Sequence, residues 1–107
     1  MKTITLNKVT VPAMVGNWYM LKDSPDTAFL VMAANIAHNN VILKTVELGG
    51  IVQEGVKNFF LERNRVYYLP FGSFVVELTE QESNAFIADR RSEVLAFFDE
   101  IKNRLSH

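Results

Sequence analysis

Hydrophobic and polar residues alternate in short runs through the first 78 residues, and such alternation is typical of strands with one covered face. Clusters of Gly, Pro, Asn, Asp and Ser separate these runs and mark turns. The strand-like runs are residues 3–11, 17–21, 28–32, 41–48, 51–62 and 63–78. This pattern predicts an antiparallel sheet or a partly open barrel of about six or seven strands.

Glycines punctuate the middle of this region. Gly49 and Gly50 follow the run 41–48, and we expect them to end that strand. Gly55 lies inside the run 51–62, where a missing side chain eases a bend. We therefore expect a β-bulge at Gly55 within one continuous strand.

Residues 25–38 allow two interpretations. As a strand, the apolar run 28–32 would pair with the equally apolar run 17–21 across a turn rich in Ser, Pro and Asp. As a helix, Ser24 would be the N-cap, Pro25 would take the first helical position, and four alanines would favour the helical conformation. We favour the strand because the two apolar runs match.

Residues Pro70 to Gly72 predict a tight turn between two strands. Pro70 presets φ at the first corner, and Gly72 can adopt the left-handed conformation that closes a three-residue loop. A three-residue loop pairs Arg65 with Glu77, whereas a two-residue loop would pair Arg65 with Leu78. We favour the first register because it pairs opposite charges. Its pairs are Leu69–Ser73, Tyr68–Phe74, Tyr67–Val75, Val66–Val76 and Arg65–Glu77.

This register predicts which side chains point inward. One face is continuously apolar and is expected to lie in the core: it carries Val66, Tyr68, Phe74, Val76 and Leu78. The opposite face, here called the mixed face, carries Arg65, Tyr67, Leu69, Ser73, Val75 and Glu77. A face of this composition is typically half covered, either by the same chain or by a partner. We expect a partner to bind at Arg65, Tyr67, Leu69 and Val75.

The pattern changes to that of a helix near residue 79. Thr79 and Glu82 have the spacing of a capping box. Apolar residues then follow at spacings of seven, four, three and four, which places them on one stripe of a helix: Ile87, Val94, Phe98, Ile101 and Leu105. We predict a helix over residues 80–105, packed across the sheet. Arg90 and Arg91 interrupt the stripe, so a break near residues 89–92 is an alternative to a continuous helix.

Two further aromatic residues widen the apolar surface of this helix. Phe86 and Phe97 lie beside the stripe rather than on it. Such a surface fits either a broad face lying on the sheet or pairing with a second copy of the chain. We include Phe86 and Phe97 among the expected partner-binding residues.

Length and composition place these elements in one domain. The chain has 107 residues, of which 49% are hydrophobic and 21% charged, as in ordinary globular domains. We therefore predict a single α+β domain over residues 1–107, with strands in 1–79 and the helix in 80–105. A net charge of −1 gives no electrostatic case for duplex DNA or an anionic membrane. We expect no membrane partner and a cytoplasmic location, because no signal-peptide pattern is present.

Catalytic and metal-binding patterns are absent from the sequence. The chain has no cysteine and two histidines, His38 in a predicted turn and His107 at the end. Asp23 and Asp26 supply too few ligands for a calcium loop. No Gly-x-Ser-x-Gly motif or phosphate-binding loop occurs. We expect no enzymatic activity, no cofactor and no metal site.

Single-stranded nucleic acid is the alternative ligand suggested by residues 57–75. Aromatic rings beside basic residues can stack unpaired bases, and Tyr67 lies near Lys57, Arg63 and Arg65. Interleaved glutamates at 54, 62 and 77 oppose this function. In element order the chain is similar in outline to pleckstrin-homology-like domains and to small strand-rich nucleic-acid binders that end in a helix. That similarity transfers no binding residue.

The leading functional hypothesis is a non-enzymatic binding or assembly module. The mixed face and the helix together offer more apolar surface than a single copy of the chain needs to bury. We therefore expect self-association into a homo-oligomer. Another protein is a further possible partner, and single-stranded nucleic acid is the alternative.

Overall fold

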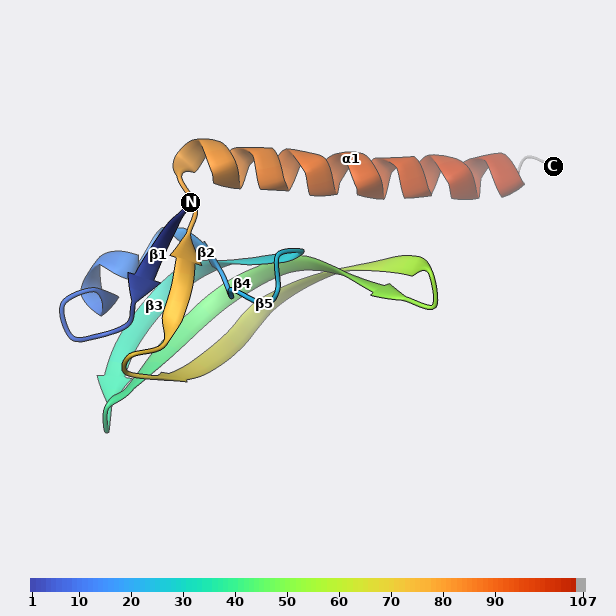
Figure 1. The fold of residues 1–107 in the computed structure, drawn as a ribbon. Coiled ribbons are helices and arrows are strands. Elements are labelled where there is room, and N and C mark those ends of the chain that lie inside the picture. The colour runs from blue at the N-terminus through green and yellow to red at the C-terminus, as the bar shows by residue number, and fades with distance from the viewer. Residues whose placement is uncertain (106–107) are drawn as a thin grey trace.

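The computed structural model describes residues 1–105, except for the side chains of residues 51–53 and 57. In this part of the chain six strands form one open antiparallel sheet in the order β1-β6-β2-β3-β4-β5, followed by helix α1 (Figure 1). The predicted α+β architecture is confirmed. Its elements are β1 (Lys2–Thr5), the 3-10 helix η1 (Val11–Met14), β2 (Trp18–Met20), β3 (Thr27–Ala37), β4 (Asn40–Gln53), β5 (Val56–Pro70), β6 (Phe74–Glu77) and α1 (Glu80–Leu105).

Residues 27–37 form a strand, as the sequence analysis favoured. β3 pairs with β2 through Trp18 and Leu30. It also pairs with β4 along its whole length, with a register shift between Val31 and Ala33. The alanines do not impose a helix, because pairing on both edges and burial of Phe29 and Val31 outweigh a weak local propensity.

Tight turns join the three longest strands. His38 and Asn39 have positive φ and connect β3 to β4, while Glu54 and Gly55 do the same between β4 and β5. Two residues with positive φ are what a type I′ hairpin turn requires. The prediction of a bulge at Gly55 is therefore wrong, because this glycine lies at the hairpin turn.

The expected strand break at residues 49–50 is also wrong, since both glycines lie inside β4. Gly49 is needed there because of close packing rather than a turn. A Cβ atom added to it would lie 2.5 Å from Thr27 Oγ1 and 2.7 Å from the Phe60 ring. The glycine lets the neighbouring side chains on β3 and β5 approach the β4 backbone.

The predicted hairpin between β5 and β6 does not form. A local turn is present, since Ser73 N–H donates to the Pro70 carbonyl at 3.2 Å and Gly72 has φ of 87°. However, β5 pairs with β4, whereas β6 pairs with β1 and β2. Turn residues fix the local change of direction, but they do not fix which strand becomes the neighbour.

The core lies on the inner face of the curved sheet, and the predicted sidedness is inverted. Val75 and the rings of Phe29 and Tyr67 lie in or against this core. By contrast, Tyr68 is 70% exposed and Phe74 is 58% exposed. Alternation with period two separates the side chains into two faces, but it does not determine which face the rest of the chain covers. Val66 of the set predicted to be buried is exposed as well, whereas Leu78 is buried in a separate cluster and Val76 packs against that cluster.

Helix α1 begins at the predicted capping box. Thr79 N–H donates to Glu82 Oε1, and Glu82 N–H donates to Thr79 Oγ1, each at 3.1 Å. The helix then runs without interruption from Glu80 to Leu105, so the alternative of a break near 89–92 is not realised. No helix in the described part of the chain has both the length and the apolar character needed to cross a membrane.

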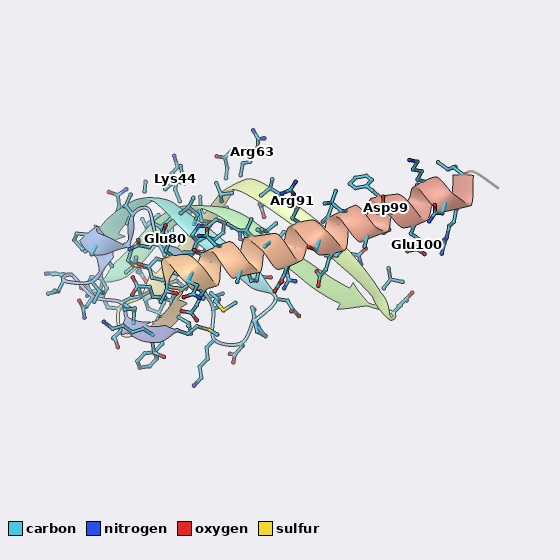
Figure 2. All side chains as sticks on the ribbon, turned by 90° about the horizontal axis from the view of Figure 1, so that it is seen from above. Lys44, Arg63, Glu80, Arg91, Asp99 and Glu100 are labelled. Carbon is cyan, nitrogen blue, oxygen red and sulfur yellow. The ribbon has the colours of Figure 1, made fainter. Side chains whose placement is uncertain are left out.

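The start of α1 packs on the outer face of the sheet. Phe86 packs against a second cluster formed by Met20, Ala28 and Leu78. Arg90 pairs with Asp26 at 3.4 Å and with Glu93 at 3.0 Å. From there the helix continues past the tip of the β4–β5 hairpin, so the molecule is elongated, with extents of 58 × 25 × 21 Å (Figures 1 and 2).

Candidate association surface and polar cavity

Most of the apolar stripe predicted for α1 does not face the sheet. We call it the lateral stripe, defined as Ile87, Val94, Phe98, Ile101 and Leu105. Helical geometry places its centre roughly 90° around α1 from Phe86 and roughly 50° from Arg90, the two residues that contact the sheet. Phe98 is 60% exposed, and Leu105 is more exposed still. The apolar repeat is therefore displayed, and polar or aromatic side chains hold the helix in place.

A groove separates the second half of α1 from the tip of the β4–β5 hairpin. Its volume is about 520 Å³, and Val56 and Phe59 of β5 line one wall. Phe97, Ile101 and Arg104 of α1 line the other. Phe97, which the sequence analysis chose as a partner-binding residue, thus lies at an accessible position beside the lateral stripe.

Further apolar side chains are exposed on the outer face of the sheet. Leu61, Val66 and Tyr68 of β5 are all exposed. They lie opposite Leu48, Lys44 and Ile42 of β4, and directly paired residues share one face of a sheet. The sequence analysis missed Tyr68 and Phe74 as surface residues, because a continuous apolar face was taken as the signature of a core.

A polar cavity lies on the inner face, around Glu47 of β4. Its volume is about 220 Å³. The Glu47 side chain is nearly buried, accepts a hydrogen bond from the Tyr67 hydroxyl, and lies 4.0 Å from Arg65 Nε. The cavity is lined by Leu21, Ser24, Thr27, Phe29, Glu47, Phe60, Arg65 and Tyr67.

The environment of Tyr67 suppresses its ionisation. Burial, followed by the hydrogen bond to the Glu47 carboxylate, raises the pKa of Tyr67 to about 12. One ring contact is with Phe29, at 4.8 Å between centroids, and the Arg65 guanidinium lies 5.3 Å from the Tyr67 ring centroid. Tyr67 is thus a well-packed member of the cavity wall.

The predicted partner-binding residues fall into four separate places, one of which is the groove beside Phe97. Val75 has no exposed surface, and Leu69 packs against the same core, so the mixed face is not an available docking surface. Arg65 and Tyr67 come together, but at the polar cavity. Phe86 is half-buried beneath the Arg90 guanidinium, 4.6 Å from its ring centroid.

The nucleic-acid alternative loses its proposed stacking platform. The Tyr67 ring is occupied by contacts to Phe29 and Arg65 rather than open to a base. Arg63 is exposed on β5, and the Lys57 side chain lies outside the described part of the structure. The rings that are accessible on this part of the sheet, Tyr68 and Phe74, belong to different strands.

Glu47 is the functional candidate that sequence reasoning overlooked. The run 41–48 places Val41, Leu43, Thr45 and Glu47 on one side. A single carboxylate at the end of an otherwise apolar or neutral row was the available signal, because buried charged groups need partners and often have a specific role. Its partner Tyr67 lies 20 residues further along the chain, so the pair becomes visible through strand pairing alone.

Comparisons with protein family models, with curated proteins and with solved structures find no match for this chain. Among the residues that the structure describes, no group of three or more His, Asp or Glu side chains is placed to hold a metal ion. The lateral stripe and the polar cavity are therefore the features from which a function can be inferred.

Proposed function

We propose that this protein is a non-enzymatic assembly module that forms a homo-oligomer by pairing of its α1 helices. The single observation that carries the proposal is the exposure of the lateral stripe. A row of exposed apolar side chains along one helix is typical of interaction sites. A cytoplasmic location remains the accompanying prediction.

The spacing of the lateral stripe favours a helix as the partner. If Arg91 is included as one polar position, the residues of the lateral stripe are separated by alternating steps of four and three. This spacing is the repeat of a coiled coil. The stripe extends from residue 87 to residue 105, or about 27 Å at 1.5 Å per residue. A second helix lying along it would cover the exposed faces of Phe98 and Leu105.

The charge distribution of α1 favours a second copy of the same helix in antiparallel orientation. Glu80 and Glu82 lie in the first turn, and Lys102 and Arg104 lie in the last. Antiparallel pairing brings the acidic end of one helix toward the basic end of the other, and it also opposes the two helix dipoles. A helix from an unrelated protein would have this matching arrangement of acidic and basic ends only by chance.

The deciding experiment compares a stripe variant with a matched control in the full chain. Phe98→Glu places a charge in the proposed helix pair, whereas Asn103→Glu adds the same charge on the opposite side of α1. We expect an oligomer for the original chain and the control, and a monomer for Phe98→Glu, by sedimentation velocity over a dilution series. We expect Phe98→Glu to weaken self-association at least about a hundredfold, because burying an unpaired charge costs roughly 3 kcal/mol.

A monomeric original chain at high micromolar concentration would remove the assembly proposal. Equal weakening by both variants would show that general charge repulsion, not the lateral stripe, controls association. Circular dichroism of each variant establishes that α1 remains helical. If the protein instead binds single-stranded nucleic acid, it should retard an oligonucleotide, and the retardation should weaken as salt is added. The same samples can be used to test for this binding.

A further inference from the structure

The polar cavity combines a nearly buried carboxylate with aromatic walls. Glu47 is 6% exposed. The rings of Phe29, Phe60 and Tyr67 line the same space of about 220 Å³. This volume is smaller than the roughly 300–1,000 Å³ of sites for drug-sized ligands, so any ligand must be small.

The charges around this cavity favour a cation over an anion. Glu62 of β5 lies directly opposite Glu47 of β4 and so shares its face of the sheet. Among the described residues that line the cavity, Arg65 is the one basic side chain. Its Nε lies 4.0 Å from Glu47 Oε2, beyond hydrogen-bonding distance, and its side chain is 49% exposed. Arg65 therefore compensates the buried carboxylate only in part.

The structure already shows a cation in contact with one of these rings. The Arg65 guanidinium lies 5.3 Å from the centroid of Tyr67, within the range of a cation–π interaction. A positively charged ligand would use the same two features, the Tyr67 ring and the Glu47 carboxylate. Because the Arg65 side chain is 49% exposed, it can move into solvent when a ligand cation takes its place beside the Glu47 carboxylate.

We propose that the polar cavity binds a small organic cation, such as a quaternary ammonium or alkylammonium compound, in competition with Arg65. Glu47 supplies the opposite charge, and the three rings supply the surface over which the cation is held. The Tyr67 hydroxyl keeps the carboxylate oriented toward the cavity. This function is independent of helix pairing, since the cavity lies on the inner face and the lateral stripe on α1.

The first measurement uses choline and its uncharged analogue 3,3-dimethylbutan-1-ol on the full chain. The two molecules have closely similar shapes and differ in charge. We expect choline to bind at least about tenfold more tightly, by isothermal titration and by shifts of the Phe60 and Tyr67 ring signals in NMR spectra. Equal binding of the two compounds, or no choline binding at tens of millimolar, overturns the proposal.

Replacement of Arg65 provides the sharper test, because it separates a cation site from an anion site. In the proposed site, Arg65→Met removes the internal competitor, so choline should bind about tenfold more tightly, as expected when a charge-assisted contact is freed. A site for an anion would instead bind more weakly in this variant. Arg63→Met makes the same change of charge outside the cavity lining and should leave the affinity nearly unchanged.

Replacement of Glu47 should have the opposite effect. Glu47→Gln keeps the shape of the side chain and removes its charge, so we expect choline affinity to fall at least about tenfold. If that variant does not fold, Arg65→Met and the choline comparison still decide the question, since neither alters a buried group. Weaker choline binding by Arg65→Met would contradict the proposal whatever Glu47→Gln does.

Discussion

Tyr67 and Tyr68 are neighbours in the sequence and have opposite environments. Tyr67 lies against the core, with Phe29 on its ring and Glu47 at its hydroxyl. Tyr68 is largely exposed on the outer face. The inner face of the sheet is thus covered by its own chain around Phe29 and Val75. The outer face is covered near the start of α1 and is open elsewhere. Apolar character alone does not distinguish the two faces.

This difference locates stability and association in different parts of the molecule. The inner face, with Val11, Met14 and Val75 fully enclosed, is where substitutions should unfold the protein. The outer face and the lateral stripe of α1 expose apolar side chains that contribute little to the fold of one copy. Substitutions there should act on partners instead.

The largest expected effect comes from replacing one phenylalanine on each face of the sheet by alanine, which tests the difference between the two faces directly. Phe29 is fully buried, so Phe29→Ala should lower the free energy of unfolding by about 3–5 kcal/mol. Phe74 is mostly exposed, so Phe74→Ala should change it by no more than about 0.5 kcal/mol. Urea denaturation of both variants below the association concentration provides the measurement. Similar losses at the two sites would show that the faces are not different.

A smaller effect is expected where three inner-face strands approach each other. Gly49→Ala introduces a Cβ that must displace Thr27 Oγ1 or the Phe60 ring, and we expect a loss of about 1–3 kcal/mol in unfolding free energy. Adding Thr27→Ala should recover part of this loss, so that the double variant loses less than the sum of the two single ones. Strict additivity in urea denaturation would contradict the proposed contact.

The smallest expected effect is electrostatic and appears at high pH. The pKa of Tyr67 is raised by burial and by Glu47 from an ordinary value of 10.0 to about 12. The folded state therefore holds the phenol proton more tightly than the unfolded state does. This contribution to stability is fully present below pH 10, and it declines as the pH rises from 10 through 12. Thermal unfolding against pH should show the decline in the original chain and a weaker decline in Tyr67→Phe.

Several elements could be predicted because their signals are local. The capping box at Thr79 and Glu82, the helix that follows, and the β2–β3 hairpin all depend on residues close together in sequence. The wrong assignment of β5 and β6 as a hairpin concerns contacts between distant parts of the chain. The turn at Pro70 and Gly72 was identified, but its flanking strands pair with β4 and with β1 and β2 instead.

Strand pairing also determines which residues meet at the candidate sites. Glu47 and Tyr67 meet because Leu43 pairs with Tyr67 and Thr45 with Arg65 across β4 and β5. No local pattern specifies that contact. Likewise, the repeat on α1 predicts an apolar stripe, but not whether the sheet or the solvent lies beside it. The contacts of Phe86 and Arg90 settle the rotation of the helix.

The class of fold, the helix and its start, and the absence of familiar catalytic motifs could be read from the amino-acid sequence, because alternation, capping and composition act over a few residues. The tertiary structure alone decided which face of β5 is buried, which stripe of α1 is displayed, and that a carboxylate, a phenol and a guanidinium share one cavity. Neighbouring strands have many possible pairings of similar local energy, and the choice among them depends on how the whole chain closes around its core.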